Sequence, residues 1–155
     1  MAGKIEARLA ELGIELPTPA APAANYIPYT VSGNLVLISG QITFWNGALQ
    51  YTGKVGVDLT VDDAYKAARV CGLNLLVQLR DACGGELDRV RKVLRLEGFV
   101  SAGSDFTDHP RIINGASDLM VEVFGDAGRH ARFAVGTPAL PLDSAVEVAG
   151  IFEID

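Results

Sequence analysis

The stretch RFAVGTPALPLDSAVEVAGIFEI, residues 132–154, decides the fold of this chain. Two runs of β-forming residues, 132–137 and 145–154, flank the turn-forming segment Leu-Pro-Leu-Asp at 140–143 and predict two strands. In the second run both alternating sets of side chains are largely apolar, which is typical of a strand covered on both faces. One face carries Val146, Val148, Phe152 and Ile154, and the other carries Ala145, Ala149 and Ile151.

Two amphipathic helices are expected before this stretch. Apolar residues recur at steps of three and four over residues 60–84 and 107–125, which is the spacing of one buried helix face. Thr60 is a suitable N-cap for the first helix, and Gly84-Gly85 ends it. Between the helices, residues 89–100 predict another strand.

The N-terminal part of the chain is predicted to add two hairpins and an extension. Runs at 26–31 and 34–39 predict the first hairpin, and the turn pair Asn46-Gly47 predicts a smaller one. Residues 1–25 are expected to form a short helix and a Pro/Ala arm before a single α/β domain, 26–155. The order of elements predicts a mixed sheet with two long helices on one face. Since two helices cannot cover both apolar faces of this sheet, we expect an oligomer.

The overall composition disfavours several classes of protein. The chain has 155 residues and a formal net charge of −6, and its basic residues are scattered. The densest basic group, 89–95, alternates with apolar residues as a solvated strand face does, so nucleic acid is not expected as a partner. No apolar run reaches membrane-spanning length and no signal peptide is recognised. Cys71 and Cys83 are interpreted as buried apolar residues in a reducing compartment, which predicts a cytoplasmic protein.

Common catalytic and metal-binding motifs are not found in the sequence. Lys54 follows a glycine, but Val55 stands where a phosphate-binding loop needs Ser or Thr. No serine lies in a GxSxG motif. His109 and His130 are far apart in the chain, and without further ligands they predict surface or capping roles rather than a metal site.

Two charged residues in the C-terminal stretch stand out. Period-two alternation places Arg132 on one strand face with Ala134 and Gly136, and it separates Glu147 from its apolar neighbours in the final strand. A charge on a largely apolar sheet face is costly unless it is paired or lies in a cleft. Two interpretations follow. Arg132 forms a salt bridge, with Glu147 or between subunits, or its forked donors bind a small carboxylate in a cleft.

Several motifs together resemble a known family. They are Ile27-Pro28-Tyr29, Leu37-Ile38-Ser39-Gly40-Gln41-Ile42, Asn114, Ala131-Arg132, Leu140-Pro141 and Val146-Glu147-Val148. Arg132 lies eight residues before Leu140-Pro141, and Glu147 lies six residues beyond that proline. This combination is similar to the reactive-intermediate deaminase (Rid/YjgF) family. The resemblance implies a chorismate-mutase-like fold of the bacillar type, in which three subunits pack their sheets into a central barrel with clefts between subunits.

The resemblance also implies an activity. Members of the family hydrolyse 2-imino acids such as 2-iminopropanoate, or their enamine tautomers, to 2-oxo acids and ammonia, without a metal or organic cofactor. By this resemblance Arg132 and Glu147 are the catalytic pair, Arg132 binding the substrate carboxylate and Glu147 activating water. The substrate-binding residues it implies are Tyr29, Gly40, Asn114 and Ala134, with Gly40 and Ala134 acting through the main chain.

The sequence departs from the family pattern in places. Ala134 stands where many members have cysteine, and the segment 45–59 is longer than the family pattern, which leaves the shape of the cleft mouth open. Two alternative functions stay open as well. One is a non-enzymatic module that binds a small carboxylate or a partner protein. The other is a ribonuclease or translation inhibitor, a label that the family often carries.

Overall fold

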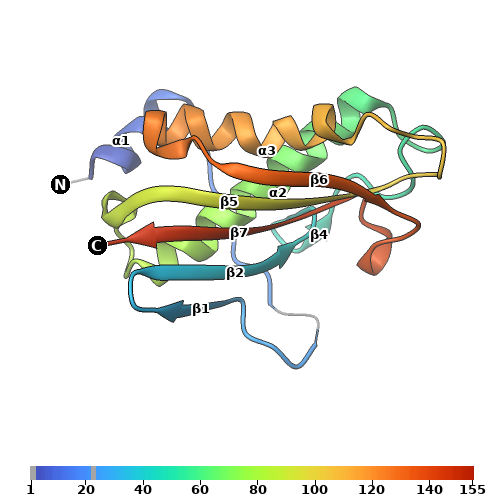
Figure 1. The fold of residues 1–155 in the computed structure, drawn as a ribbon. Coiled ribbons are helices and arrows are strands. Elements are labelled where there is room, and N and C mark those ends of the chain that lie inside the picture. The colour runs from blue at the N-terminus through green and yellow to red at the C-terminus, as the bar shows by residue number, and fades with distance from the viewer. Residues whose placement is uncertain (1–2, 22–23) are drawn as a thin grey trace.

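The computed structural model describes residues 3–21 and 24–155 and contains a five-stranded sheet (Figure 1). Its strands lie in the order β1-β2-β7-β5-β6. Neighbouring strands are antiparallel except β5 and β6, which are parallel, so the predicted mixed sheet is confirmed. The strands are β1 (Tyr29–Ser32), β2 (Leu35–Gln41), β5 (Val90–Ser101), β6 (Ala131–Thr137) and β7 (Val146–Ile154).

A separate small hairpin follows β2. It consists of β3 (Phe44–Trp45) and β4 (Ala48–Leu49). Asn46 and Gly47 have φ values of 50° and 86°, and positive φ at both positions is what a type I′ turn requires. The predicted turn is therefore confirmed. The chain after this hairpin returns to the main domain, where Val55 forms a bridge with Ala102.

Two long helices cover one face of the five-stranded sheet, as Figure 1 shows. They are α2 (Val61–Ala82) and α3 (His109–Phe124), and the hydroxyl of Thr60 caps α2 by accepting from the backbone N–H of Asp63 at 3.1 Å. The helices approach closely at Gly115, where a Cβ would lie 3.0 Å from the carbonyl carbon of Tyr65. The core lies between the helices and the sheet, with Leu75, Leu79, Leu96, Ile112 and Phe152 fully buried.

The opposite face of the sheet carries apolar side chains that no helix of the described ranges covers. Leu37 and Val135 are 41% and 42% exposed there. Phe99 and Phe133 meet edge to face on the same side, with 5.4 Å between ring centroids. An uncovered apolar sheet face is typical of a subunit interface. The oligomer expected from the sequence stays a prediction, and this is the face at which its subunits would meet.

A short helix near the N-terminus, α1 (Lys4–Glu11), lies against α3. The carboxylate of Asp88 accepts hydrogen bonds from the backbone N–H groups of Lys4 and Ile5, both at 2.8 Å, and so caps this helix from another part of the chain. Pro22 and Ala23 of the predicted arm lie outside the described residues. Within 3–21 and 24–155, no helix is long and apolar enough to cross a bilayer.

Candidate functional site

Arg132 lies on β6, the edge strand of the sheet, and its side chain points to the helix-covered side. It pairs with Leu96, which is fully buried under the helices. The guanidinium donates from Nη1 to Ser117 Oγ at 3.0 Å and from Nη2 to the carbonyl oxygen of Pro110 at 3.1 Å. A guanidinium has five N–H donors, so both contacts with α3 hold it while leaving donors for a ligand.

Ser117 connects Arg132 to a histidine. His130 Nδ1 lies 2.6 Å from the carbonyl oxygen of Gly128, which can only accept, so Nδ1 carries the proton. In the neutral ring Nε2 is then an acceptor, and the Ser117 hydroxyl, 2.8 Å away, donates to it. The Ser117 oxygen in turn accepts from Arg132. Each donor and acceptor in this chain of hydrogen bonds is therefore assigned.

Burial favours the neutral form of His130. Loss of hydration lowers the pKa of this histidine, the carbonyl of Gly128 opposes the change, and the positive charge of Arg132 lowers the pKa further. A neutral imidazole is the form that accepts from Ser117, so the electrostatics and the hydrogen bonds agree. The sequence predicted a surface or capping role for His130, whereas the structure shows it half-buried behind Arg132.

Asn114 and Ala134 lie close to Arg132. Asn114 is exposed on α3, four residues after Pro110 and three before Ser117, so it shares the helix face that contacts the guanidinium. Ala134 follows Arg132 in the same row of β6. These members of the expected site are therefore brought together at one edge of the sheet.

Glu147 lies elsewhere, on the uncovered face of the sheet. Its carboxylate rests over Gly40 of β2, where a Cβ would come 2.8 Å from Glu147 Cδ, so the missing side chain at 40 makes room for the carboxyl group. The pairing of β2 with β7 shifts register between Ile38 and Gln41, at this contact. Burial raises the pKa of Glu147. Glu147 and Gly40, two of the residues expected at the site, are thus adjacent.

Tyr29 lies at the other edge of the sheet from Arg132. Its hydroxyl donates to Asp81 Oδ2 at 2.6 Å, and this hydrogen bond, with burial and the negative charge of Asp81, raises the pKa of the phenol. Strand β1 is separated from β6 by β2, β7 and β5. Four spacings of about 4.8 Å place the two edges roughly 19 Å apart. Tyr29 and Arg132 of one chain cannot touch the same small ligand.

The structure also excludes an Arg132–Glu147 salt bridge within one chain. Between residues 95 and 101, β5 pairs without a bulge to both neighbours, and Leu96 faces Arg132 while Phe99 faces Glu147. Residues an odd number apart on a strand point to opposite faces, so the two charged side chains lie on opposite sides of the sheet. In 3–21 and 24–155 neither residue belongs to an ion pair.

No group of three or more His, Cys, Asp and Glu side chains in the described ranges could hold a metal ion. The residues expected from the sequence instead fall into three separate groups. Arg132, Asn114 and Ala134 lie at one edge, Glu147 and Gly40 on the uncovered face, and Tyr29 at the opposite edge. A site that uses all three groups needs more than one copy of the chain.

Comparison with known proteins gives matches along nearly the whole chain. A curated relative, "Protein TCP17" of Trypanosoma cruzi, is 44% identical over 154 residues, covering 99% of this chain and 96% of the relative. A crystal structure described as "a putative endoribonuclease" from Shewanella oneidensis is 41% identical with a TM-score of 0.94, covering 98% of this chain and 100% of that one.

A more distant match carries the name RidA. The RidA structure from an Antarctic Psychrobacter species is 26% identical with a TM-score of 0.58, and the match covers 88% of this chain and 93% of that chain. The family model described as "YjgF/chorismate_mutase-like, putative endoribonuclease" matches residues 6–154. The motifs, the mixed sheet with two helices on one face, and these matches agree, and the chain belongs to the YjgF/chorismate-mutase-like family.

Proposed function

We propose that this protein hydrolyses 2-imino acids, or their enamine tautomers, to 2-oxo acids and ammonia. One observation carries the proposal. The guanidinium of Arg132 is fixed at a sheet edge by Ser117 and Pro110 and retains donors for a ligand. A planar fork of N–H donors matches the two oxygens of a carboxylate, which every substrate of this class carries.

Glu147 is the proposed base. Since burial raises the pKa of its carboxyl group, Glu147 accepts a proton more readily than an exposed glutamate does. It takes a proton from water as the oxygen attacks the imine carbon, and this proton passes to the nitrogen to give a carbinolamine. The second proton, that of the new hydroxyl group, then passes to the nitrogen as the C=O bond forms, the C–N bond breaks and ammonia leaves. The imine carbon is already electrophilic, so positioning of substrate and water supplies most of the catalysis.

The proposal places the site between copies of the chain. Arg132 and Glu147 lie on opposite faces of one sheet, and Tyr29 lies at the far edge, so one chain does not assemble them. A ring of three copies, as the family resemblance implies, would bring the β6 edge of one copy to the uncovered face of the next. The apolar residues on that face support such packing.

The proposed function is tested with a dehydratase that generates 2-iminopropanoate. The decay of the imine is followed with and without this protein, and we expect faster decay in its presence. Arg132→Lys keeps the charge but loses the fork, so its acceleration should fall at least about tenfold. Arg91→Lys is the matched control, because Arg91 is an exposed partner of Asp155 far from the site. Equal rates with and without the wild-type protein would refute the proposal.

Endoribonuclease activity is a second candidate, because relatives of the chain carry that description. The formal net charge of −6 disfavours it, since RNA binding draws on a basic surface. Cleavage of a single-stranded RNA by the protein, with affinity that falls steeply as salt rises, would establish it. Binding of a small carboxylate, with no cleavage of RNA and no turnover of any imine, would favour a non-enzymatic module.

A further inference from the structure

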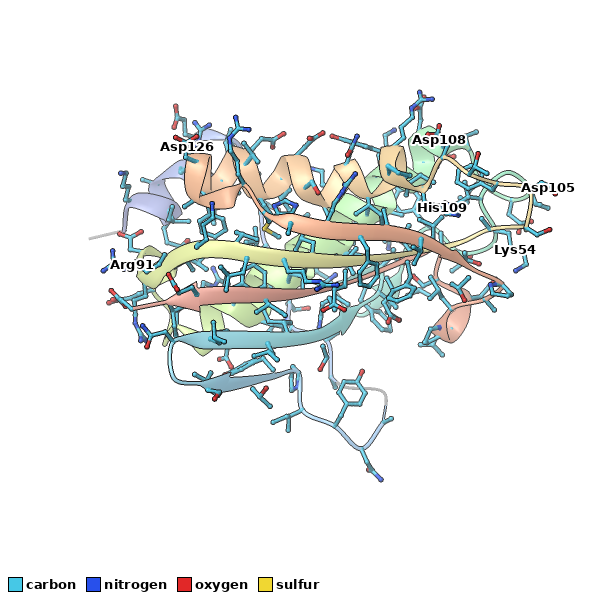
Figure 2. The ribbon with its side chains drawn as sticks, in the orientation of Figure 1. Lys54, Arg91, Asp105, Asp108, His109 and Asp126 are labelled. Carbon is cyan, nitrogen blue, oxygen red and sulfur yellow. The ribbon has the colours of Figure 1, made fainter. Side chains whose placement is uncertain are left out.

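A cavity of about 540 Å³ lies beyond the C-terminal end of β6, next to the start of α3. Figure 2 shows two of the basic side chains at this end of the molecule, His109 and Lys54. These two carry the ionisable groups among the lining residues. The lining also includes Phe106, Gly136 and Pro138.

The imidazole of His109 is seated on the edge strand. A Cβ at Gly136 would overlap the ring, coming 3.1 Å from Cδ2 and closer still to Nε2, so only glycine leaves space for it. Phe106 packs edge to face against the same ring, with 5.2 Å between centroids. The side chain is thus held between a glycine and an aromatic ring at one wall of the cavity.

Lys54 forms another part of the wall. It comes from the long segment 45–59, and its ammonium donates to the carbonyl oxygen of Pro138. A tight turn holds it, because the carboxylate of Asp58 accepts from the backbone N–H of Lys54 at 2.9 Å. An ammonium has three donors, so a ligand can accept from those that remain.

The acidic residues nearby, Asp58 in the Lys54 turn included, do not line this cavity. Asp105 and Asp108 belong to the loop before α3, where Figure 2 labels them, but neither lines the cavity. Asp108 forms an ion pair with Arg111 of α3, with 3.8 Å between Asp108 Oδ2 and Arg111 Nη1. The cavity therefore presents positive charge from Lys54 and hydrogen-bonding nitrogen from His109.

The cavity lies along the same row of β6 as the anchor at Arg132. Arg132, Ala134 and Gly136 form one row on β6, so Gly136 lies one step of about 7 Å beyond Ala134. Pro110, whose carbonyl accepts from Arg132, directly follows His109 in the first turn of α3. A ligand anchored at Arg132 that extends along the strand past Ala134 meets His109 and Lys54.

We propose that the cavity is an anion subsite for the substrate's side chain, so that the preferred substrates are 2-imino acids whose side chain ends in a second carboxylate. This inference rests on the proposed function, because that function assigns Arg132 as the residue that binds the first carboxylate. Arg132 binds the carboxylate next to the imine, and Lys54 with His109 binds the distal one. Arg132 and Gly136 are two steps of the β6 row apart, about 14 Å, so the long side chains of Arg132 and Lys54 and a ligand side chain of a few carbon atoms bridge the row together. The same wall accepts a phosphate monoester, so the test includes one.

The first test measures binding and does not depend on turnover. Dissociation constants are measured by calorimetry on the full chain for 2-oxo acid products, with 2-oxopentanedioate compared with 2-oxopentanoate. We expect the dicarboxylate to bind about tenfold more tightly, as a charge-assisted contact at a partly open site provides. Lys54→Met should remove this preference without changing the affinity for 2-oxopentanoate, and Lys54→Arg should keep it. Lys66→Met, an exposed change on α2, is the matched control.

Several outcomes overturn the proposal. Equal affinity for the two acids in the wild type, or an equal loss for both in Lys54→Met, means that Lys54 does not contact a distal carboxylate. A 2-oxo acid ending in phosphate that binds tenfold more tightly than the dicarboxylate assigns the subsite to phosphate esters instead.

The second test measures turnover. Imines of acidic and of neutral amino acids are generated by an amino acid oxidase, and kcat/KM is compared. We expect a preference for the dicarboxylic imine that is lost in Lys54→Met and in His109→Phe. If no imine is hydrolysed but the Lys54-dependent binding preference persists, the proposed function fails while the subsite stands. Turnover with no preference between the imines refutes the subsite alone.

Discussion

Replacing Ser117 by alanine should weaken catalysis through Arg132. The Ser117 oxygen accepts from Arg132 Nη1 at 3.0 Å, and its hydroxyl donates to His130 Nε2 at 2.8 Å. Alanine removes both bonds and leaves the guanidinium with the carbonyl of Pro110 as its remaining contact on α3. The guanidinium then rotates more freely, so its N–H donors are less well aligned with a carboxylate ligand.

The size of the effect follows from the bond that is lost. A hydrogen bond to a charged group contributes about 1.5–3 kcal/mol. Arg132 is partly exposed, so we take the lower end of that range, about 1.5 kcal/mol. This corresponds to a roughly tenfold loss of kcat/KM for the imine substrate. The free energy of unfolding should fall by about 1 kcal/mol, because His130 Nε2 loses its donor.

The assay compares kcat/KM for imine hydrolysis in the wild type, Ser117→Ala and Ser117→Thr. Threonine keeps the oxygen and should restore most of the activity, which a merely structural loss would not explain. Ser32→Ala, an exposed change at the end of β1, is the control and should leave the rate unchanged. Wild-type kcat/KM in Ser117→Ala, alongside a large loss in Arg132→Lys, would show that Ser117 does not position the guanidinium.

Three further predictions concern stability. Gly115→Ala should lower the free energy of unfolding in urea by about 2 kcal/mol, because its Cβ would press on the carbonyl of Tyr65 and force α2 and α3 apart; no change would contradict the close packing. The pKa of His130 is lowered from the ordinary histidine value of 6.5, so the unfolded chain binds more protons than the folded one as the pH falls past 6.5. The free energy of unfolding should therefore fall as the pH drops through 6.5, and His130→Gln should lose this dependence. The pKa of Glu147 is raised in the folded chain, so its ionised form lowers the stability at pH values above that pKa. Glu147→Gln should therefore melt at a higher temperature than the wild type at pH 7.5, and the difference should shrink as the pH falls towards 4. A lower melting temperature of Glu147→Gln at pH 7.5 would contradict this prediction.

Local patterns predicted the elements of the fold well. The period-two alternation placed Arg132 and Ala134 in one row, and the helical spacing, the N-cap Thr60 and the turn at Asn46-Gly47 all match the structure. These features depend on residues close in the chain, where backbone geometry fixes which side chains share a face.

The arrangement of the site could not be predicted in the same way. That β7 lies between β2 and β5 follows from the packing of the whole sheet, and this order separates Tyr29 from Arg132. The contact of Ser117 with His130 joins a helix to the segment before β6, and no short-range pattern marks it. Lys54 and His109 line one cavity because the segment 45–59 passes the C-terminal end of β6, where Lys54 donates to the carbonyl of Pro138. Lys54, whose surrounding sequence does not match a phosphate-binding loop, thus has a different proposed role.

Mixing two inactive variants tests most directly whether Arg132 of one copy works with Glu147 of another. Arg132→Ala and Glu147→Gln are each purified, unfolded together in equal amounts, refolded and assayed for imine hydrolysis. If every site joins Arg132 of one subunit to Glu147 of the next, random mixing gives about a quarter of the sites both intact residues, so about a quarter of wild-type activity should return. Each variant refolded alone should stay inactive, and the wild type refolded alone sets the full activity. A mixture that forms mixed oligomers yet remains inactive would contradict a site shared between subunits.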